Sequence, residues 1–427
     1  MLARTLCLIA TLACTVWGSA PGPGAAADDA WQAGVARIGI TPEPGMWMAG
    51  YASRDRPADG TLTELWAKAL VLEDAAGHRA VLITADLIGF SRELSQAICE
   101  DLAEQCRLER EQLAICASHT HTGPALWRNL APLHYLIVDP DQQQRIEAYT
   151  RSVQGKIVEV TRRALQNLEP AQLTWGSGRA TFAVNRRNNR PENLVEQLRG
   201  EGKLQGPVDH DVPVLAVRES RGDLACVVFG YACHATVLSS YEWSGDYPGF
   251  AQLELESRHP GCQAMFWAGC GADQNPLPRR TVALARDYGR QLASAVEDVL
   301  DGKLERIQPG LATRYQEIQL PFAELPSTEA IRQDTQATNR YVAARARSLL
   351  DQIQSGQPLQ PCYPYPVQVW RLGRDVQWIF LGGEVVVDFA TRLKQELGDR
   401  KTWVAGYAND VMAYIASRRI LREGGYE

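Results

Sequence analysis

Several sequence features that would indicate a nucleic-acid-binding, repeat or multidomain protein are absent from this chain. Lysine and arginine form no extended basic stripe, and the formal net charge is −6. Because binding to a phosphate backbone draws on clustered Lys and Arg, we expect no nucleic-acid partner. No linker rich in proline and serine, no internal repeat and no low-complexity segment divides the 427 residues. The sequence therefore predicts one large α/β domain, with a mixed sheet core flanked by helices.

The cysteines lack the spacing of a thiolate metal cluster. There are ten of them, yet no two form a Cys-X-X-Cys pair. A zinc site made of cysteines is therefore not expected. Cys7 and Cys14 lie in the N-terminal segment, which leaves eight in the rest of the chain. Their pairing cannot be read from sequence, and those in apolar runs, such as Cys116, fit buried free thiols equally well.

The N-terminal apolar segment is too short for a membrane-spanning helix. Arg4 supplies a positive start, residues 6–17 are apolar, and small residues occupy positions 25–27. A bilayer span needs about 20 apolar residues, which disfavours a membrane anchor. Cys14 matches a lipoprotein signal poorly. We expect residues 1–27 to be a secretory signal peptide, a mature chain that starts near Asp28 with no transmembrane segment, and a secreted or periplasmic location.

Apolar runs alternate with helix-period patterns along the rest of the chain. We expect strands at 65–72, 79–90, 113–118, 212–217, 225–232, 263–267, 376–381 and 403–406. We expect helices from Ser91, over 142–168, 281–300 and 328–353, and one that ends at 397. Polar residues follow several of these strands. Since open α/β sheets bind ligands at the carboxyl ends of their strands, we expect the functional site there.

The segment after the strand at 113–118 holds two of the seven histidines, His119 and His121. Side chains two apart on a strand share a face, so both imidazoles are expected to point into one pocket. Neutral imidazole is a common metal ligand and also a proton shuttle near neutral pH, and the pair can divide these roles. The alternative is a pair of histidines held by hydrogen bonds in a loop.

Two further donors follow other predicted strands. His234 comes after the strand at 225–232, and Glu384 comes after the strand at 376–381 and two glycines. Together with His119 they would give three donors and an open position, which is what catalytic zinc requires. Each also has a simpler interpretation, because His234 fits a hydrogen-bonded core histidine and Glu384 fits a cap of the following helix.

Taken together, these motifs resemble the neutral ceramidase family, the zinc amidases that cleave the N-acyl bond of ceramide. The resemblance begins at Ile-Gly-Ile-Thr-Pro (38–42) and Met-Ala-Gly-Tyr (48–51), and residues 119–124 approximate the family's His-Thr-His-X-Gly-Pro element. Further matches follow in the same order along the chain: Asn185-Arg186, His234, Glu384, Tyr414 and Tyr426-Glu427.

The resemblance implies a role for each matched residue. The zinc ligands would be His119, His234, Glu384 and Tyr414. His121, Arg186 and Tyr426 would face the scissile bond, where His121 relays a proton and the other two stabilise the developing oxyanion. The implied reaction is hydrolysis of a linear N-acyl amide, such as a ceramide-like lipid, by zinc-bound hydroxide. Transient contact with a membrane surface is compatible with such a substrate.

The chain departs from the family at two places. Gln274 stands where the ceramidases carry a serine in a glycine-rich loop, and an amide cannot act as a nucleophile. Gln274 can instead hydrogen-bond substrate, and Asp246 is a second substrate-binding candidate whose alternative is a turn-forming role. Residues 28–427 would correspond to the catalytic domain, and the family's C-terminal sandwich domain is absent or cut from this sequence.

Two other functions stay open on these residues. One is a deacylase or esterase of a more polar N-acyl or O-acyl substrate, such as an acylated sugar. A shallow polar cleft would indicate it, whereas a long apolar tunnel would indicate a lipid. The other is a binding protein that retains the fold without turnover, for which the loss of the serine at Gln274 is the motive.

Overall fold

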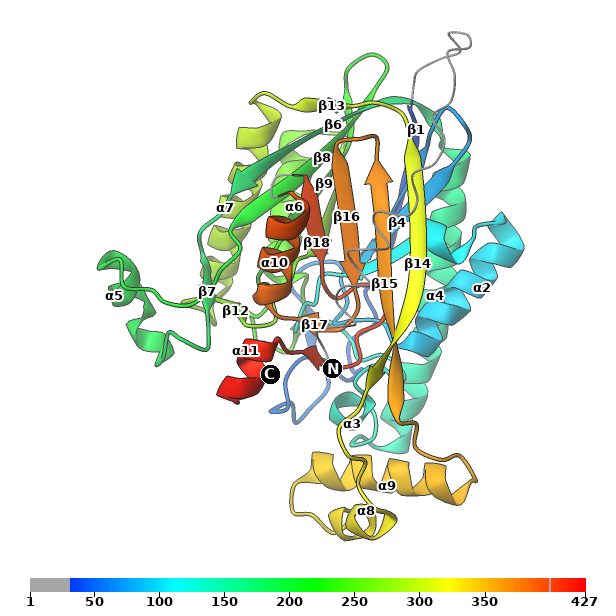
Figure 1. Cartoon of the computed structure of the whole chain (residues 1–427), viewed down its shortest axis with the longest axis vertical. Coiled ribbons are helices and arrows are strands. Elements are labelled where there is room, and N and C mark those ends of the chain that lie inside the picture. The colour runs from blue at the N-terminus through cyan, green and yellow to red at the C-terminus, as the bar shows by residue number, and fades with distance from the viewer. Residues whose placement is uncertain (1–30, 399–400) are drawn as a thin grey trace.

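The protein is described by a computed structural model that covers residues 31–398 and 401–427 (Figure 1). The predicted signal peptide therefore lies outside the described residues. Within those residues, no helix has the length and apolar character needed to cross a membrane. The eight cysteines of the described part are free thiols, six of them buried.

A nine-stranded mixed sheet forms the centre of the molecule, in the order β11-β9-β8-β6-β1-β3-β4-β5 with β13 paired to β6. Its strands are β1 (Trp31–Gly39), β3 (Trp66–Glu73), β4 (Arg79–Ala85), β5 (Leu113–Ala117), β6 (Glu169–Arg179), β8 (Asp211–Glu219), β9 (Leu224–Tyr231), β11 (Gln263–Ala268) and β13 (Glu305–Ile307). The pairs β4–β5 and β9–β11 are parallel, and the other pairs are antiparallel. The predicted mixed α/β fold is confirmed.

A second sheet of four strands packs on one face of the first, in the order β14-β15-β16-β18. Its strands are β14 (Leu311–Pro321), β15 (Cys362–Leu372), β16 (Val376–Leu381) and β18 (Thr402–Ala405). The core between the sheets is rich in tryptophan, with Trp175 of the large sheet in edge contact with Trp403 of the small one. Burial of such large aromatic surfaces holds the two sheets together.

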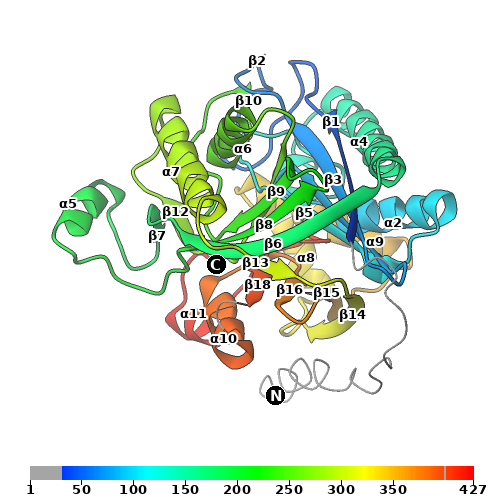
Figure 2. The ribbon, with the colours of Figure 1, turned by 90° about the horizontal axis from the view of Figure 1, so that it is seen from above.

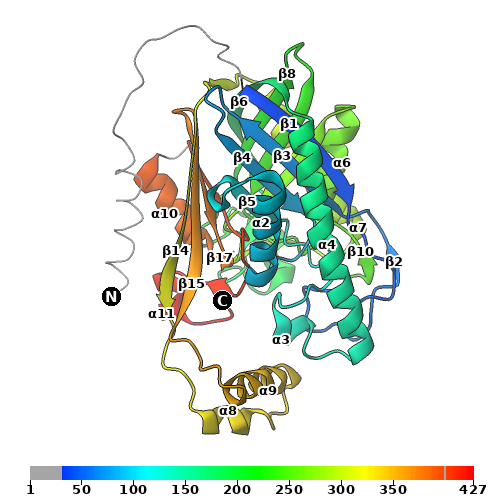
Figure 3. The same ribbon diagram turned by 90° about the vertical axis from the view of Figure 1, so that its right-hand side faces the viewer.

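Helices cover the outer faces, as Figures 2 and 3 show. Four of them pack on the free face of the large sheet: α2 (Arg92–Cys106), α4 (Pro140–Gln166), α6 (Asp246–Arg258) and α7 (Val282–Leu300). Helix α10 (Val387–Leu397) covers the outer face of the small sheet. The remaining short helices are α3 (Ala131–His134), α5 (Val195–Gly200), α11 (Arg418–Glu423) and the 3₁₀ turns η1 (Arg110–Gln112) and η2 (Glu192–Leu194).

The prediction of one helix over 328–353 is wrong. The structure has two helices, α8 (Thr328–Asp334) and α9 (Arg340–Gln354), which project from the link between β14 and β15 (Figure 1). Asn339 starts the second helix, because its side chain accepts hydrogen bonds from the backbone N–H groups of Tyr341 and Val342. An asparagine at this position favours a new N-cap over a continuous helix.

The edges of the large sheet curve toward each other, so that β5 and β11 come into contact. The end of β18 and the segment after it lie between these edges, with bridges from Ala405 to Gly269 and from Ala408 to Cys116. Three short strand pairs lie at this end: β2 (Gly60–Thr61) with β10 (Glu242–Trp243), β7 (Ala183–Asn185) with β12 (Gln274–Pro276), and β17 (Glu384–Val385) with β19 (Tyr414–Ile415). Strand ends from both sheets thus meet in one place.

Candidate metal centre

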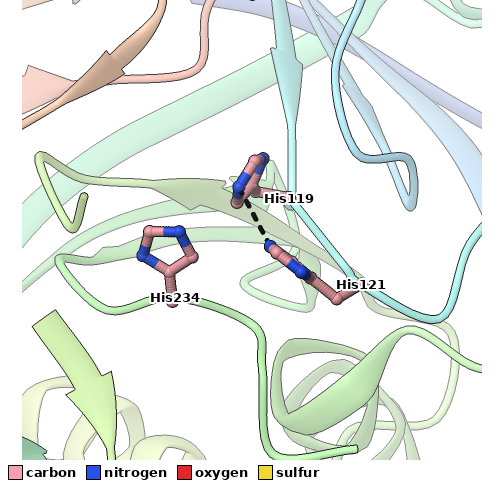
Figure 4. Close-up of side chains that lie close together, drawn as sticks. All are labelled: His119, His121 and His234. Carbon is pink, nitrogen blue, oxygen red and sulfur yellow. Dashed lines mark hydrogen bonds between the residues drawn. The ribbon is translucent and has the colours of Figure 1, made fainter. Parts of the chain in front are cut away.

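His119 and His121 lie in the loop after β5, with their ring centroids 4.9 Å apart (Figure 4). The expectation that strand alternation brings them together is wrong, because β5 ends at Ala117 and His119 has a φ of +58°. The turn itself folds the two imidazoles toward each other, so that their Nε2 atoms are 3.2 Å apart. A positive φ at a non-glycine residue is uncommon and is often found at functional sites.

His234 follows β9 and approaches the same point from the other edge of the large sheet. Its backbone N–H donates to the carbonyl of Gln274 (3.0 Å), and its Nδ1 lies 2.8 Å from the carbonyl oxygen of Gly271. The turn at 271–274, which follows β11, therefore fixes both the backbone and the ring. A Cβ at Gly271 would lie 2.6 Å from the backbone nitrogen of Cys233, so this close approach requires glycine.

Glu384 and Tyr414 reach the site from the short strands β17 and β19, where they are register partners in a parallel pair. The carboxylate of Glu384 is buried and lies 3.2 Å from the Nε2 of His234 and 3.3 Å from the Nε2 of His119. The structure therefore brings Glu384, on the separate two-stranded ladder β17–β19, together with the two histidines that follow strands of the large sheet.

The hydrogen bonds at the far side of the rings show what fits between them. The Nδ1 atoms of His119 and His234 face the carbonyl oxygens of Ile88 (2.6 Å) and Gly271 (2.8 Å), which assigns the ring proton to Nδ1 in both. Their unprotonated Nε2 atoms then face the Glu384 carboxylate, so that hydrogen-bond acceptors lie against one another with no proton between them. Such an arrangement is stable only with a cation between them, and carbonyls behind the ring nitrogens are the usual support of metal-binding histidines. The residues present thus fit a metal ion.

The imidazole of His121 belongs to the same group. Ligand atoms of His119, His121 and His234 all lie within 4.8 Å of one another, close enough to hold one ion (Figure 4). The Nδ1 of His121 is buried without a hydrogen-bond partner among the described residues. Its ring packs on that of Tyr51, with centroids 4.9 Å apart.

The surroundings of His121 and His234 keep these two imidazoles neutral. Burial lowers the pKa of His234 to about 4, with a further contribution from the positive charge of Arg186. Burial and the neighbouring histidines hold the pKa of His121 well below its usual range. Burial raises the pKa of Glu384, but positive charge beside it, on the His119 and His234 rings when they are protonated, outweighs this and holds the pKa well below its ordinary value. Neutral imidazoles beside an ionised carboxylate are the protonation states in which metal ions are bound.

Arg186 lies directly after β7, and its side chain reaches the phenol of Tyr414. Its Nη2 donates to the hydroxyl of Tyr414 (3.2 Å), and its Nε donates to the Glu427 carboxylate (2.9 Å). Tyr426 sits over the same guanidinium, with its ring centroid 5.4 Å from Arg186 Cζ, but its side chain is 72% exposed. Arg186, Tyr414 and Tyr426 thus form one cluster at the rim of the site.

Gln274 and Asp246 are both completely buried. The Nε2 of Gln274 donates to the carbonyl of Pro207 (3.3 Å), whereas its Oε1 has no partner in the described part of the chain. Both carboxylate oxygens of Asp246 accept backbone N–H bonds, from Val237, Leu238 and Tyr247. Substrate contact by either residue stays a prediction.

Sequence reasoning missed three residues next to the histidines. Tyr407 packs on the ring of His119 with centroids 4.2 Å apart, and its buried hydroxyl has no partner in the described residues. Its position directly after β18 matches the pattern of the other site residues and could have indicated it. Gly50 and Tyr51 pack against His121, and a Cβ at Gly50 would lie 2.6 Å from the Cα of His121. Only their presence in the Met-Ala-Gly-Tyr motif pointed to them.

The fold and site together define an α/β protein of two packed sheets with a buried histidine- and carboxylate-rich centre that suits a metal ion. Residues 31–272 match the family model of the neutral/alkaline non-lysosomal ceramidases, N-terminal region. The chain belongs to this family, which confirms the resemblance seen in the sequence. Glu384, Tyr414 and Tyr426 lie beyond the matched segment.

Two curated relatives and two solved structures are similar to the chain. The neutral ceramidase of Pseudomonas aeruginosa is 28% identical over 255 residues, a match that covers 57% of this chain and 37% of the relative. Neutral ceramidase A of Dictyostelium discoideum is 24% identical over 249 residues, covering 57% and 34%. The matched segment thus spans little more than a third of either relative's length.

The fold comparisons extend further along the chain. The crystal structure of the Pseudomonas aeruginosa neutral ceramidase superposes with a TM-score of 0.72 at 21% identity, covering 94% of this chain and 71% of that one. A ceramidase complexed with C2 gives a TM-score of 0.72 at 18% identity, covering 94% and 72%. At these identities the likeness concerns the fold alone.

Proposed function

We propose that this protein is a secreted, zinc-dependent amidohydrolase that cleaves a linear N-acyl amide, with a ceramide-like lipid as the reference substrate. The observation that carries the proposal is the convergence of the Nε2 atoms of His119 and His234 on the Glu384 carboxylate. Family membership supports the same chemistry.

The donor set favours zinc. Two imidazoles, a carboxylate and the phenol of Tyr414 are borderline nitrogen and oxygen ligands, whereas Ca²⁺ and Mg²⁺ prefer oxygen throughout. His119, His234, Glu384 and Tyr414 would hold the ion. When bound, zinc supplies Lewis-acid chemistry, which polarises an amide carbonyl and acidifies a water molecule.

The remaining side chains would handle the proton and the charge. We assign proton transfer to His121, because its Nδ1 has no partner among the described residues and its ring lies beside that of His119. Arg186 donates to Tyr414 and keeps Nη1 within 3.5 Å of the side-chain oxygen of Asn275. A guanidinium at this place can stabilise an oxyanion that develops at the amide carbonyl, with Tyr426 beside it.

Gln274 determines whether the reaction can pass through a covalent acyl intermediate. A buried amide cannot form a covalent acyl intermediate, so water must attack the amide carbon directly. The unpartnered Oε1 of Gln274 is free to accept a hydrogen bond from the substrate N–H. We expect Gln274→Ala to reduce the rate less than substitution of His119, Glu384 or His121.

The direct test is hydrolysis of a substrate panel by the purified, zinc-loaded protein. Ceramides of different chain length would be compared with N-acylated and N-acetylated sugars and with O-acyl esters. We expect release of the amine from a long-chain N-acyl amide. If no amide or ester is turned over while zinc is bound, the protein is a non-catalytic binding relative and the proposal is wrong.

A further inference from the structure

Tyr51 links His121 to two arginines that the proposed reaction does not use. The guanidinium carbons of Arg54 and Arg280 lie 5.3 Å and 5.0 Å from the centre of its ring, which also packs on His121. Arg280 Nη1 donates to the Tyr51 hydroxyl (2.9 Å), which in turn donates to the carbonyl of Leu238 (2.7 Å). The Tyr51 ring therefore holds the Arg280 guanidinium at a fixed distance from the site.

Neither arginine is neutralised by a carboxylate in the described part of the chain. Arg54 is only 3% exposed, yet its Nη atoms donate to backbone carbonyls, those of His121 (3.0 Å), Ser240 (2.6 Å) and Ser239 (3.4 Å). Its Nε has no partner among the described residues. A buried charge without a counter-charge is costly, and its field is weakly screened.

The other charged side chains near Tyr51 do not cancel the positive charge of Arg54 and Arg280. Arg279 is paired with Glu192 through two hydrogen bonds (2.6 and 3.0 Å). Asp246 is the acidic group that faces Tyr51 and Arg280, and its oxygens already accept three backbone N–H bonds. Even a fully ionised Asp246 offsets only one of the two guanidiniums.

The charges around Arg186 are balanced differently. There Arg186 and Arg187 both pair with the Glu427 carboxylate, and Glu423 adds a second negative charge beside Arg187. An incoming anion would therefore find its unneutralised positive charge on the Tyr51 side.

Arg280 is the group on that side which can meet a ligand. Its side chain is exposed, whereas Arg54 is enclosed. Its backbone has a φ of +94°, and its N–H donates to the carbonyl of Val237 (2.7 Å). Residues in such sparsely populated conformations persist where the surrounding structure holds them, frequently at ligand clamps.

We propose that Arg280, held by Tyr51, binds an anionic group on the amine portion of the substrate, so that the preferred substrate is an N-acyl amine that carries a carboxylate. This rests on the proposed hydrolysis of N-acyl amides and names the substrate class of the same site. Hydrogen bonds between a guanidinium and a carboxylate are stronger than those between neutral groups, and this difference would favour substrates with a carboxylate. Arg54 adds a background field without touching the ligand.

The test uses two substrates of nearly equal shape, N-dodecanoylglycine with a carboxylate and N-dodecanoylglycinamide with a neutral carboxamide, and measures the dodecanoic acid that each releases. For the wild-type protein we expect kcat/KM to be about tenfold higher for the carboxylate, since a charged hydrogen bond is worth more than a neutral one. Arg280→Gln should abolish this ratio, and Arg280→Lys should retain part of it. The matched control is Arg221→Gln, an exposed arginine paired with Glu219 and Asp223 in the turn between β8 and β9, which should leave the ratio unchanged.

Salt gives an independent check. Raising NaCl from about 0.05 M to about 0.5 M should reduce the wild-type ratio through screening and leave that of Arg280→Gln unchanged. Equal kcat/KM values for the two substrates in the wild type, or a ratio that survives in Arg280→Gln, would overturn the inference.

Failure of the proposed reaction would be recognised separately, because then neither compound is hydrolysed. Calorimetric binding of the same two compounds to the wild type and to Arg280→Gln would still decide. Tighter binding of N-dodecanoylglycine that is lost in the variant supports an anion site at Arg280. Equal affinities for the two compounds contradict it.

Discussion

Glu384 and Tyr414 are register partners in the two-residue parallel pair β17–β19. The backbone N–H of Glu384 donates to the carbonyl of Ala413 (2.8 Å), which ties the carboxylate to the strand that carries the phenol. A Cβ at Gly383 would lie 2.7 Å from the side chain of Ile415, so this strand crossing is tightly packed. Two predicted ligands are thus set by one short ladder rather than by flexible loops.

The first prediction separates the two phenols of the rim. Tyr414→Phe should lower zinc affinity, by about 10- to 100-fold, the range seen when a group that supports a metal site is lost. Tyr426→Phe should keep the metal, because Tyr426 is 72% exposed and its ring, which packs on Arg186 and Tyr414, stays in place when the hydroxyl is removed. Competition with a chelator measures both affinities. An equal loss of affinity in the two variants would contradict this division.

The second prediction separates ligand from proton shuttle. His119→Ala should lose both zinc and activity, because its Nε2 faces Glu384 and its Nδ1 is held by Ile88. His121→Ala should keep zinc and lose about 10²- to 10⁴-fold in rate, the usual range for general acid–base catalysis. Zinc content and amidase rate are measured on both variants side by side.

The three-histidine arrangement makes this a sharp comparison. The Nε2 of His121 lies 3.2 Å from that of His119, near enough for both to bind one ion. Equal loss of zinc in the two variants would show that His121 is itself a ligand. In that case the proton shuttle would have to be another group.

The third prediction concerns the glycine behind His121. Gly50 has a φ of +97°, and an added Cβ would lie 2.6 Å from the Cα, Cβ and Cγ of His121. Gly50→Ala should therefore displace His121 and reduce the rate as well as stability. The matched control is Gly45→Ala, with a φ of +91° and open space around the added Cβ. It should cost only about 1–2 kcal/mol from the left-handed backbone and leave the rate unchanged.

Thermal unfolding and amidase rate on the two glycine variants check this prediction. A Gly50→Ala protein with the wild-type rate would show that His121 tolerates a shift and is not held by this packing.

The fourth prediction follows from the burial of Asp246, which raises its pKa to about 6 from an ordinary 3.8. The folded protein then binds this proton more tightly than the unfolded chain between about pH 4 and pH 6. The stability that Asp246 contributes is therefore present below pH 4, falls as the pH rises to 6 and is constant above.

The measurement is the free energy of unfolding of the wild type and of Asp246→Asn across that range. The free energy of unfolding of the wild type minus that of Asp246→Asn should fall with rising pH, by at most on the order of 3 kcal/mol. If this value rises with pH instead, the three backbone N–H donors stabilise the carboxylate as the anion, and the prediction is wrong.

Part of this architecture could be read from sequence because its signals are local. His119, His234 and Glu384 each follow a short apolar run, and strands of that kind deliver polar groups at their carboxyl ends. The helix that starts after Ser91 was indicated by its cap, and the structure shows the Ser91 side chain accepting from Leu94 N–H.

The parts that could not be predicted depend on tertiary contacts. Strand β14 is half exposed along its length, so its residues show no clear apolar run and it was not predicted, although β16 and β18 of the same sheet were. The proximity of Tyr51 and Arg280 arises only when loops 229 positions apart in the sequence meet beside His121. The break between α8 and α9 was also not predicted, because the residues on both sides of Asn339 have a helical pattern.

The central claim is that amide hydrolysis depends on one metal ion held by His119, His234 and Glu384. The most direct test is metal analysis of the purified protein together with its amidase rate before chelation, after chelation and after reloading with zinc. We expect about one zinc per chain, loss of activity with the metal and recovery on reloading. His234→Ala should contain almost no zinc. Full activity in the metal-free protein, or undiminished zinc in His234→Ala, would contradict this account.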